Sequence, residues 1–207
     1  EWRLTVDRFR EDLQWIKEHG YTTVLPSELS SGHGLPEKAV MITFDDGYTS
    51  NYTLLYPLLQ EFGAKAVISV IAQRIETGVP GFLTWDMCRE MAASGLVEIG
   101  SHTYNLHGSQ PVMGIKRLDG ECQADYEARV FPDIQKSIDC ITENVGAAPL
   151  FFAYPYGRTD PWAADFLAEH FAVTVTTAEK TADISGGLYA LPRYNISMKK
   201  GVGAYLA

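Results

Sequence analysis

Short apolar stretches alternate along this chain with longer segments in which apolar residues recur every three or four positions. The short stretches are rich in β-branched and aromatic residues and lie between turn residues, so they predict strands over 21–25, 40–44, 66–71, 97–100, 150–153, 171–176 and 189–196. The longer segments have the spacing of amphipathic helices, which predicts helices over 7–19, 51–62, 84–94, 122–144 and 160–170. Loops are expected over 30–34 and over 108–121, the second as an excursion on the surface.

Strand and helix alternate about seven times, without an internal sequence repeat or a linker. The sequence therefore predicts one α/β domain spanning residues 1–207. Its strands should be parallel, and the pattern favours a barrel over an open sheet.

The predicted strand over 40–44 stops abruptly at two adjacent acids, Asp45 and Asp46, which Gly47 follows. In parallel α/β folds the carboxyl ends of the strands carry the ligand site, because the loops that leave them converge on one opening. Two neighbouring carboxylates repel, and they share a pocket only with a cation, hydrogen bonds or a raised pKa. An Asp before a Gly also suits a turn or a helix N-cap, so the pair alone fits a structural role equally well.

Two histidines, His102 and His107, follow the predicted strand over 97–100. Five positions correspond to about 140° of rotation on a continuous helix, so the two rings can converge only if a loop or a helix start lies between them. A strand end supplies that loop. Histidine pairs are more often structural, but an acid pair at another strand end completes a set that suits a divalent ion with open positions for water and substrate.

Composition narrows the functional classes. A hydrophobic fraction of 46% and a charged fraction of 21% are those of an ordinary globular protein. The net charge of −9 disfavours nucleic acid and anionic membranes as partners, and it suits a neutral or cationic ligand. No apolar run approaches the roughly 18 to 20 residues of a membrane span, and the first residues lack the order of a signal peptide.

The cysteines offer no redox or zinc motif. Cys88, Cys122 and Cys140 show no CxxC spacing, and at most one disulfide could form within the chain. Cys88 and Cys140 lie in predicted helices and are expected to be buried thiols.

Three stretches carry a family resemblance. Residues 43–48 read TFDDGY, residues 101–107 read SHTYNLH and residues 152–157 read FAYPYG. Together they resemble the polysaccharide deacetylases of carbohydrate esterase family four, the NodB-homology domain, whose first motif is TFDDG and whose second is usually H-S/T-x-x-H. The extra residue between the histidines looks like the PgaB and IcaB type, which deacetylates poly-N-acetylglucosamine in bacterial biofilms.

This resemblance implies a distorted (β/α)7 barrel in which Asp46, His102 and His107 hold a divalent metal ion. Zinc is the expected ion, with cobalt or nickel as alternatives. Asp45 would then be the general base, and the backbone N–H of Tyr156 would stabilise the oxyanion. The resemblance also implies an acetylated polysaccharide as substrate, N-deacetylation as the reaction, and a monomer outside the cell or at its surface.

The expected substrate-binding residues are Tyr48, Tyr154 and Arg193. Sugar rings stack on aromatic faces, although aromatic residues beside a core are usually packing. Arg193 is also a candidate partner for Asp45, because residues 153–155 read AYP where the family usually has an arginine followed by two prolines. A salt bridge at the surface or core edge would explain Arg193 equally well.

The general acid is missing from the expected place. The family usually supplies a histidine near residues 191–196, but these read LPRYNI, and His170 lies in a predicted helix where a structural role is expected. Asp45 or water would therefore protonate the leaving amine, which predicts slow turnover or a need for segments outside these 207 residues.

Two other functions fit the same motifs. An esterase that removes O-acetyl groups from a polysaccharide such as xylan would use the same metal centre. A weakly catalytic carbohydrate-binding relative would explain the missing histidine and arginine, but Asp45 argues against it because a binding module needs no base.

Overall fold

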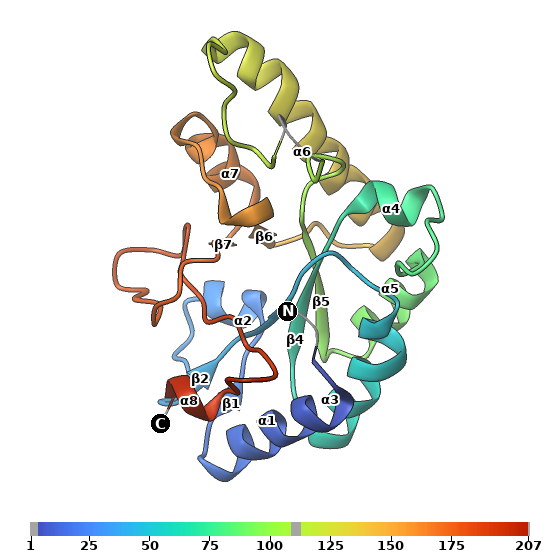
Figure 1. Ribbon diagram of the computed structural model, residues 1–207, viewed down its shortest axis with the longest axis vertical. Coiled ribbons are helices and arrows are strands. Elements are labelled where there is room, and N and C mark those ends of the chain that lie inside the picture. Colours follow the sequence, from blue (N-terminus) through green and yellow to red (C-terminus); the bar gives the residue numbers. More distant parts are fainter. Residues whose placement is uncertain (1–3, 109–112, 207) are drawn as a thin grey trace.

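A curled sheet of five parallel strands forms the centre of the molecule (Figure 1). The computed structural model describes residues 4–108 and 113–206. The strands lie side by side in chain order: β3 (Ile42–Phe44), β4 (Ala66–Val70), β5 (Val97–Ser101), β6 (Phe151–Ala153) and β7 (Val173–Val175). Because each strand pairs with the next one in sequence, the order never reverses as it does in a doubly wound open sheet.

A second, two-stranded parallel sheet continues the first. It consists of β1 (Thr22–Thr23) and β2 (Ala39–Val40). The single strand predicted over 40–44 is interrupted at Met41, so its first part pairs with β1 and its second part with β4. All seven strands of the described residues are parallel, which confirms the predicted α/β class and the distorted (β/α)7 barrel.

The strand predicted over 189–196 is wrong. Within that segment only Leu191 pairs with the sheet, through an isolated bridge to Val175. The segment is otherwise irregular. Backbone hydrogen bonds of Leu191 to Thr174 and Thr176 join it to the end of β7, and the side chain of Arg193 joins it to Thr43 of β3.

The main helices lie where the apolar spacing predicts them. They are α1 (Val6–Glu18), α3 (Tyr56–Phe62), α5 (Trp85–Ala93), α6 (Gln123–Val145) and α7 (Ala164–His170), with a π-helical turn η1 (Asn51–Leu55) before α3 and a 3₁₀ turn η3 (Pro161–Ala163) before α7. Thr5 and Thr84 cap the first turns of α1 and α5 with their hydroxyl oxygens.

Four short helical turns were not predicted. They are α2 (Pro26–Ser30), α4 (Ala72–Glu76), α8 (Gly203–Leu206) and the 3₁₀ turn η2 (Pro155–Gly157). Segments this short carry too few apolar positions to show a helical period. The α4 turn begins two residues after the end of β4, at the same edge of the sheet as the acid pair.

Alternation along the strands separates two apolar layers. Ala66, Ile68 and Val70 of β4 pack with residues of α1, α3 and α5 on the outer face of the sheet. Val67 packs with Phe151 and inward residues of β6 and β7 on the other face. A third cluster fills the space between β6, α6 and α7.

The segment over 108–121 does not lie wholly at the surface. Residues 109–112 fall outside the described residues, but Ile115 is fully buried against the α6 and α7 cluster. The predicted surface excursion is therefore wrong for Ile115, because a single apolar residue among polar neighbours gives no periodic signal.

The described residues contain no helix that is long and apolar enough to cross a membrane. Cys88 and Cys140 are buried free thiols, as predicted, and Cys122 is an exposed one. Burial raises the pKa of Cys88 to about 12, so this thiol is unreactive.

Candidate active site

Three strand ends meet at one edge of the sheet, and each carries a residue with a left-handed backbone. Asp46, Thr103 and Tyr156 have φ values of 73°, 70° and 60° and follow β3, β5 and β6. Such a conformation costs a non-glycine residue on the order of 1 kcal/mol or more, and it persists only where the surroundings impose it. Strain of this kind at three adjoining loops is typical of a functional site.

The turn after β3 requires a glycine. Gly47 has φ 80°, and a Cβ atom there would lie 2.9 Å from Cγ1 of Val70. Its carbonyl oxygen accepts from the N–H of Leu83 at 2.9 Å, and the carbonyl of Asp46 accepts from Ile71 at 3.3 Å. The turn is thereby tied to the end of β4, which fixes the direction of the two acids.

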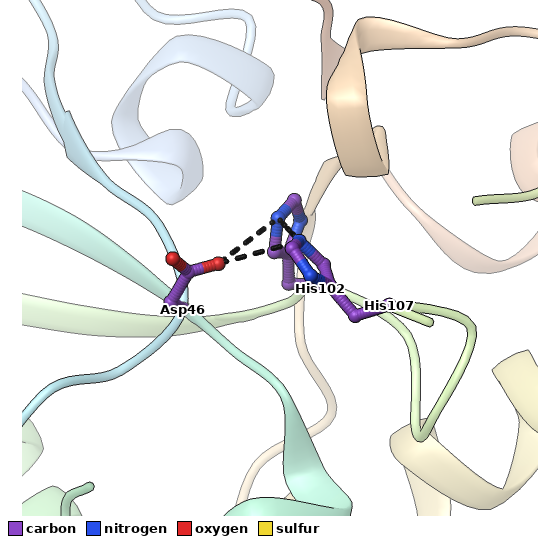
Figure 2. A group of neighbouring side chains, drawn as sticks. All are labelled: Asp46, His102 and His107. Atoms are coloured by element: carbon purple, nitrogen blue, oxygen red, sulfur yellow. Dashed lines mark hydrogen bonds and ion pairs between the residues drawn. The ribbon is translucent and has the colours of Figure 1, made fainter. Parts of the chain in front are cut away.

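The side chains of Asp46, His102 and His107 converge (Figure 2). Oδ1 of Asp46 lies 3.5 Å from Nε2 of His102 and 3.4 Å from Nε2 of His107, and the two Nε2 atoms lie 3.0 Å apart. The loop between the histidines brings both rings to one point, as the sequence predicted.

The surrounding backbone fixes the tautomer of His102. Its Nδ1 atom lies 2.7 Å from the carbonyl oxygen of Ala153, and the ring is buried. A carbonyl oxygen can only accept, so Nδ1 carries the proton and Nε2 offers its lone pair toward Asp46 and His107. This arrangement is typical of a metal-binding histidine with a backbone acceptor behind it.

This set of donors fits a divalent metal ion. Oδ1 of Asp46 is buried and has no hydrogen-bond donor among the described residues. Ligand atoms at about 2.1 Å from a tetrahedral ion lie about 3.4 Å apart, close to the separations between Asp46 and each histidine. One carboxylate and two imidazoles would leave positions open for water and substrate.

Burial lowers the pKa of His107, although Asp46 and Asp45 oppose this shift. A lowered pKa favours the neutral ring, which is the form in which a histidine binds a metal ion.

Asp45 lies next to Asp46 in the chain, but its carboxylate faces Arg193 instead of the two histidines. Arg193 donates from Nη1 to Oδ1 of Asp45 at 2.9 Å and from Nη2 to Oδ2. The same guanidinium donates from Nε to the carbonyl oxygen of Thr176 at 2.8 Å and from Nη1 to Oγ1 of Thr43 at 2.9 Å. Arg193 thus holds the carboxylate in one orientation through a bidentate pair.

Burial raises the pKa of Asp45, but the pKa lies below its ordinary value, and the charge of Arg193 is the largest cause of this lowering, supported by its hydrogen bonds. The carboxylate is therefore ionised at neutral pH. The guanidinium of Arg193 has protein partners at Nε, Nη1 and Nη2, which disfavours its predicted role as a sugar-binding residue.

Tyr156 lies beside His107. Its ring centre lies 4.7 Å from that of His107, its hydroxyl donates to the carbonyl oxygen of Gly108 at 3.0 Å, and 40% of the residue is exposed. The predicted catalytic group of Tyr156 is its backbone N–H, which the left-handed turn places at the same strand edge as the histidines.

The other two residues predicted to bind substrate, Tyr48 and Tyr154, differ in exposure. Tyr48 is 47% exposed, follows the acid pair directly and stacks on Phe82 with ring centres 4.9 Å apart. Tyr154 is buried with Phe152 in the cluster between β6, α6 and α7, and burial raises its pKa. The prediction that Tyr154 binds substrate is therefore wrong, because its side chain faces α6 and α7. His170 stacks on Phe166, as expected for a structural residue.

Sequence reasoning missed Asp133, whose carboxylate contacts the loop between the two histidines. One signal was available. Asp133 lies three positions after Val130 and four before Ser137, on the stripe of α6 that is otherwise buried. A carboxylate at such a position needs hydrogen-bond donors.

Comparison with known proteins gives matches over most of the chain. The sequence profile of the polysaccharide deacetylase family matches residues 32–173. The chain is 31% identical, over 91% of its length, to the poly-β-1,6-N-acetyl-D-glucosamine N-deacetylase of Escherichia coli K12, and it spans 33% of that protein.

Two solved structures are similar throughout. A de-N-acetylase from Aggregatibacter actinomycetemcomitans superposes with a TM-score of 0.88 at 28% identity, covering 98% of this chain and 88% of the other. IcaB from Ammonifex degensii superposes with a TM-score of 0.81 at 28% identity, covering 95% of this chain and 85% of the other.

Proposed function

This chain belongs to the polysaccharide deacetylase family, and we propose that it is a metal-dependent enzyme that removes N-acetyl groups from N-acetylglucosamine residues of a polysaccharide. The observation that carries this proposal is that the two neighbouring acids have different partners. Asp46 faces two histidines, and Asp45 faces an arginine beside them. A binding module has no use for an oriented, ionised carboxylate next to a metal site.

Asp46, His102 and His107 would hold the ion, for which we propose zinc, with cobalt or nickel as alternatives. A bound divalent ion would lower the pKa of a water molecule and polarise the carbonyl of the acetamide group.

The protein groups supply the proton transfers. Asp45 is ionised, and each of its oxygens keeps a lone pair beyond the bond from Arg193, so the carboxylate can accept a proton from the attacking water. The backbone N–H of Tyr156 would donate to the oxygen that becomes negative as the acetamide carbonyl is attacked. Asp45 would return the proton to the leaving nitrogen, so that the products are acetate and a free amine.

The proposed polymer is linked β-1,6. The support for this linkage is the name of the E. coli protein and the similarity to IcaB. A chain with net charge −9 also suits a product whose amines are positively charged. We further propose that the enzyme acts outside the cell or at its surface, as one domain and as a monomer.

The decisive assay measures acetate released from β-1,6-linked N-acetylglucosamine oligomers by the zinc-loaded protein. We expect slow release, because among the described residues no histidine beyond the two proposed ligands is in contact with the metal-binding cluster. Acetylated xylan oligomers serve as the matched ester substrate. Release from xylan alone would assign an O-acetyl esterase, release from neither would favour the binding function, and rapid turnover on the N-acetyl substrate would contradict the missing general acid.

Tyr48 is proposed to stack on a sugar ring next to the cleaved group. Replacing Tyr48 with alanine should raise KM for the oligomers by about five- to tenfold and change kcat little, since a stacked aromatic ring contributes about 1 kcal/mol. Initial rates over a range of oligomer concentrations measure this effect. Tyr189, which is 50% exposed and whose hydroxyl donates to Ala168, provides the control substitution to alanine. An unchanged KM for the Tyr48 variant would remove this residue from the binding site.

A further inference from the structure

The loop that joins the two histidines is held between two helices. On one side, the first backbone N–H groups of α4 donate to it: Ala72 to the carbonyl oxygen of Thr103 at 3.3 Å and Gln73 to that of Tyr104 at 3.1 Å. On the other side lies α6, whose Asp133 side chain reaches the same loop. The position of His107 depends on how these contacts bend the chain.

The carboxylate of Asp133 accepts two consecutive backbone donors. Oδ1 accepts the N–H of Tyr104 at 2.9 Å, and Oδ2 accepts the N–H of Asn105 at 3.0 Å. Burial raises the pKa of Asp133 to about 6, while the two N–H groups and Lys136 lower it. The chain thus keeps a costly, partly buried carboxylate at the point where both oxygens bond the histidine loop.

Side chains also connect the histidine loop to α4 and α6. The hydroxyl of Tyr104 donates to Glu76 of α4, and Nζ of Lys136 on α6 lies 3.9 Å from the centre of the Tyr104 ring. These groups are exposed, so their contacts contribute less than the bonds to Asp133. They add side-chain contacts of Tyr104 to the backbone bonds that α4 and Asp133 make with residues 103–105.

The two histidines differ in what else orients them. His102 continues β5, and the carbonyl oxygen of Ala153 fixes its ring at 2.7 Å. Among the described residues, the Tyr156 hydroxyl lies 3.4 Å from Nδ1 of His107, but it donates to the carbonyl oxygen of Gly108. The separation of the two Nε2 atoms therefore depends on the path of residues 103–106.

We propose that Asp133 is a positioning residue that sets the path of the 103–106 loop and so places His107 opposite His102 and Asp46 for metal binding. This inference rests on the proposed function, because it assigns Asp133 a role toward the ion. Asp133 touches neither the ion nor the substrate. Its effect should therefore appear in metal affinity and in the geometry around the metal.

The test compares Asp133→Ala, Asp133→Asn and Asp139→Asn with the unchanged protein. Asp139 lies on the same helix, is exposed and, within the part of the chain that the structure describes, accepts only from Gln135, so its variant controls for the lost charge. Zinc affinity is measured by competition with a chelator, and the visible absorption of the cobalt-loaded protein reports the geometry. Circular dichroism verifies that each variant is folded.

We expect Asp133→Ala to weaken zinc binding by about 10- to 100-fold, the usual effect of removing a group that orients a metal ligand, and to change the cobalt spectrum. Asp133→Asn keeps one acceptor oxygen, so its zinc affinity should lie between those of Asp133→Ala and the unchanged protein. This variant still tests the proposal if Asp133→Ala does not fold. Asp139→Asn should match the unchanged protein.

Zinc affinities within twofold of the unchanged protein for both Asp133 variants, with the same cobalt spectrum, would overturn the positioning role and leave the proposed function intact. An unchanged protein that binds neither metal would overturn both.

Discussion

Replacing Asp45 with asparagine should lower kcat for acetate release by about 10²- to 10⁴-fold, the usual contribution of a general base, and leave the metal content unchanged. Asparagine has nearly the same shape, but it cannot accept the proton of the attacking water. Metal analysis and initial rates on the same preparations measure both quantities. Equal rates for the two proteins on N-acetylglucosamine oligomers would remove Asp45 from the chemistry.

Arg193→Lys provides the comparison for this result. Lysine retains the positive charge but cannot form the paired bonds to Oδ1 and Oδ2 of Asp45. The expected loss in kcat is smaller than for Asp45→Asn, with KM little changed, because we expect Arg193 to orient the base rather than to bind the sugar. A large rise in KM instead would restore the original expectation that Arg193 binds substrate.

Replacing Asp46 or His102 with alanine should abolish stoichiometric zinc binding and reduce acetate release to background. Each substitution leaves two of three ligands, and Asp46→Ala also removes the only negative charge among them. Metal analysis after zinc loading and dialysis measures the bound ion. His33→Ala, at an exposed histidine of the loop after α2, is the control and should retain one ion per chain.

Chelation tests whether activity requires the metal ion without any substitution in the protein. Removing the ion from the unchanged protein should abolish activity, and adding zinc should restore it. Bound zinc at one equivalent in both Asp46→Ala and His102→Ala would show that the cluster is not the metal site.

The elements that repeat a period over many residues could be predicted from the sequence. The helices over 7–19 and 122–144 were located within one or two residues as α1 and α6. The acids and histidines could also be predicted as one site, since each follows a strand and the carboxyl ends of parallel strands share an edge. The family resemblance added roles that the spacing alone did not distinguish.

Other features required the tertiary structure. The sequence named Arg193 as a candidate partner for Asp45 but left a salt bridge at the surface or core edge equally open. The structure shows the pair, across 148 positions, where the segment after β7 bridges to Val175 at Leu191. Tyr154 was misassigned because its motif position suggested the site, whereas strand alternation turns Ala153 inward and Tyr154 outward.

The sequence by itself determined the α/β class, the order of the main helices and the residues that could bind a metal, because hydrophobic periodicity and local motifs depend on neighbouring positions. Only the tertiary structure decided which residues orient the proposed base and the proposed metal ligands. Arg193 became the partner of Asp45, and Asp133 became the acceptor for the histidine loop. Such pairings depend on where distant segments pack, and no local pattern encodes that distance.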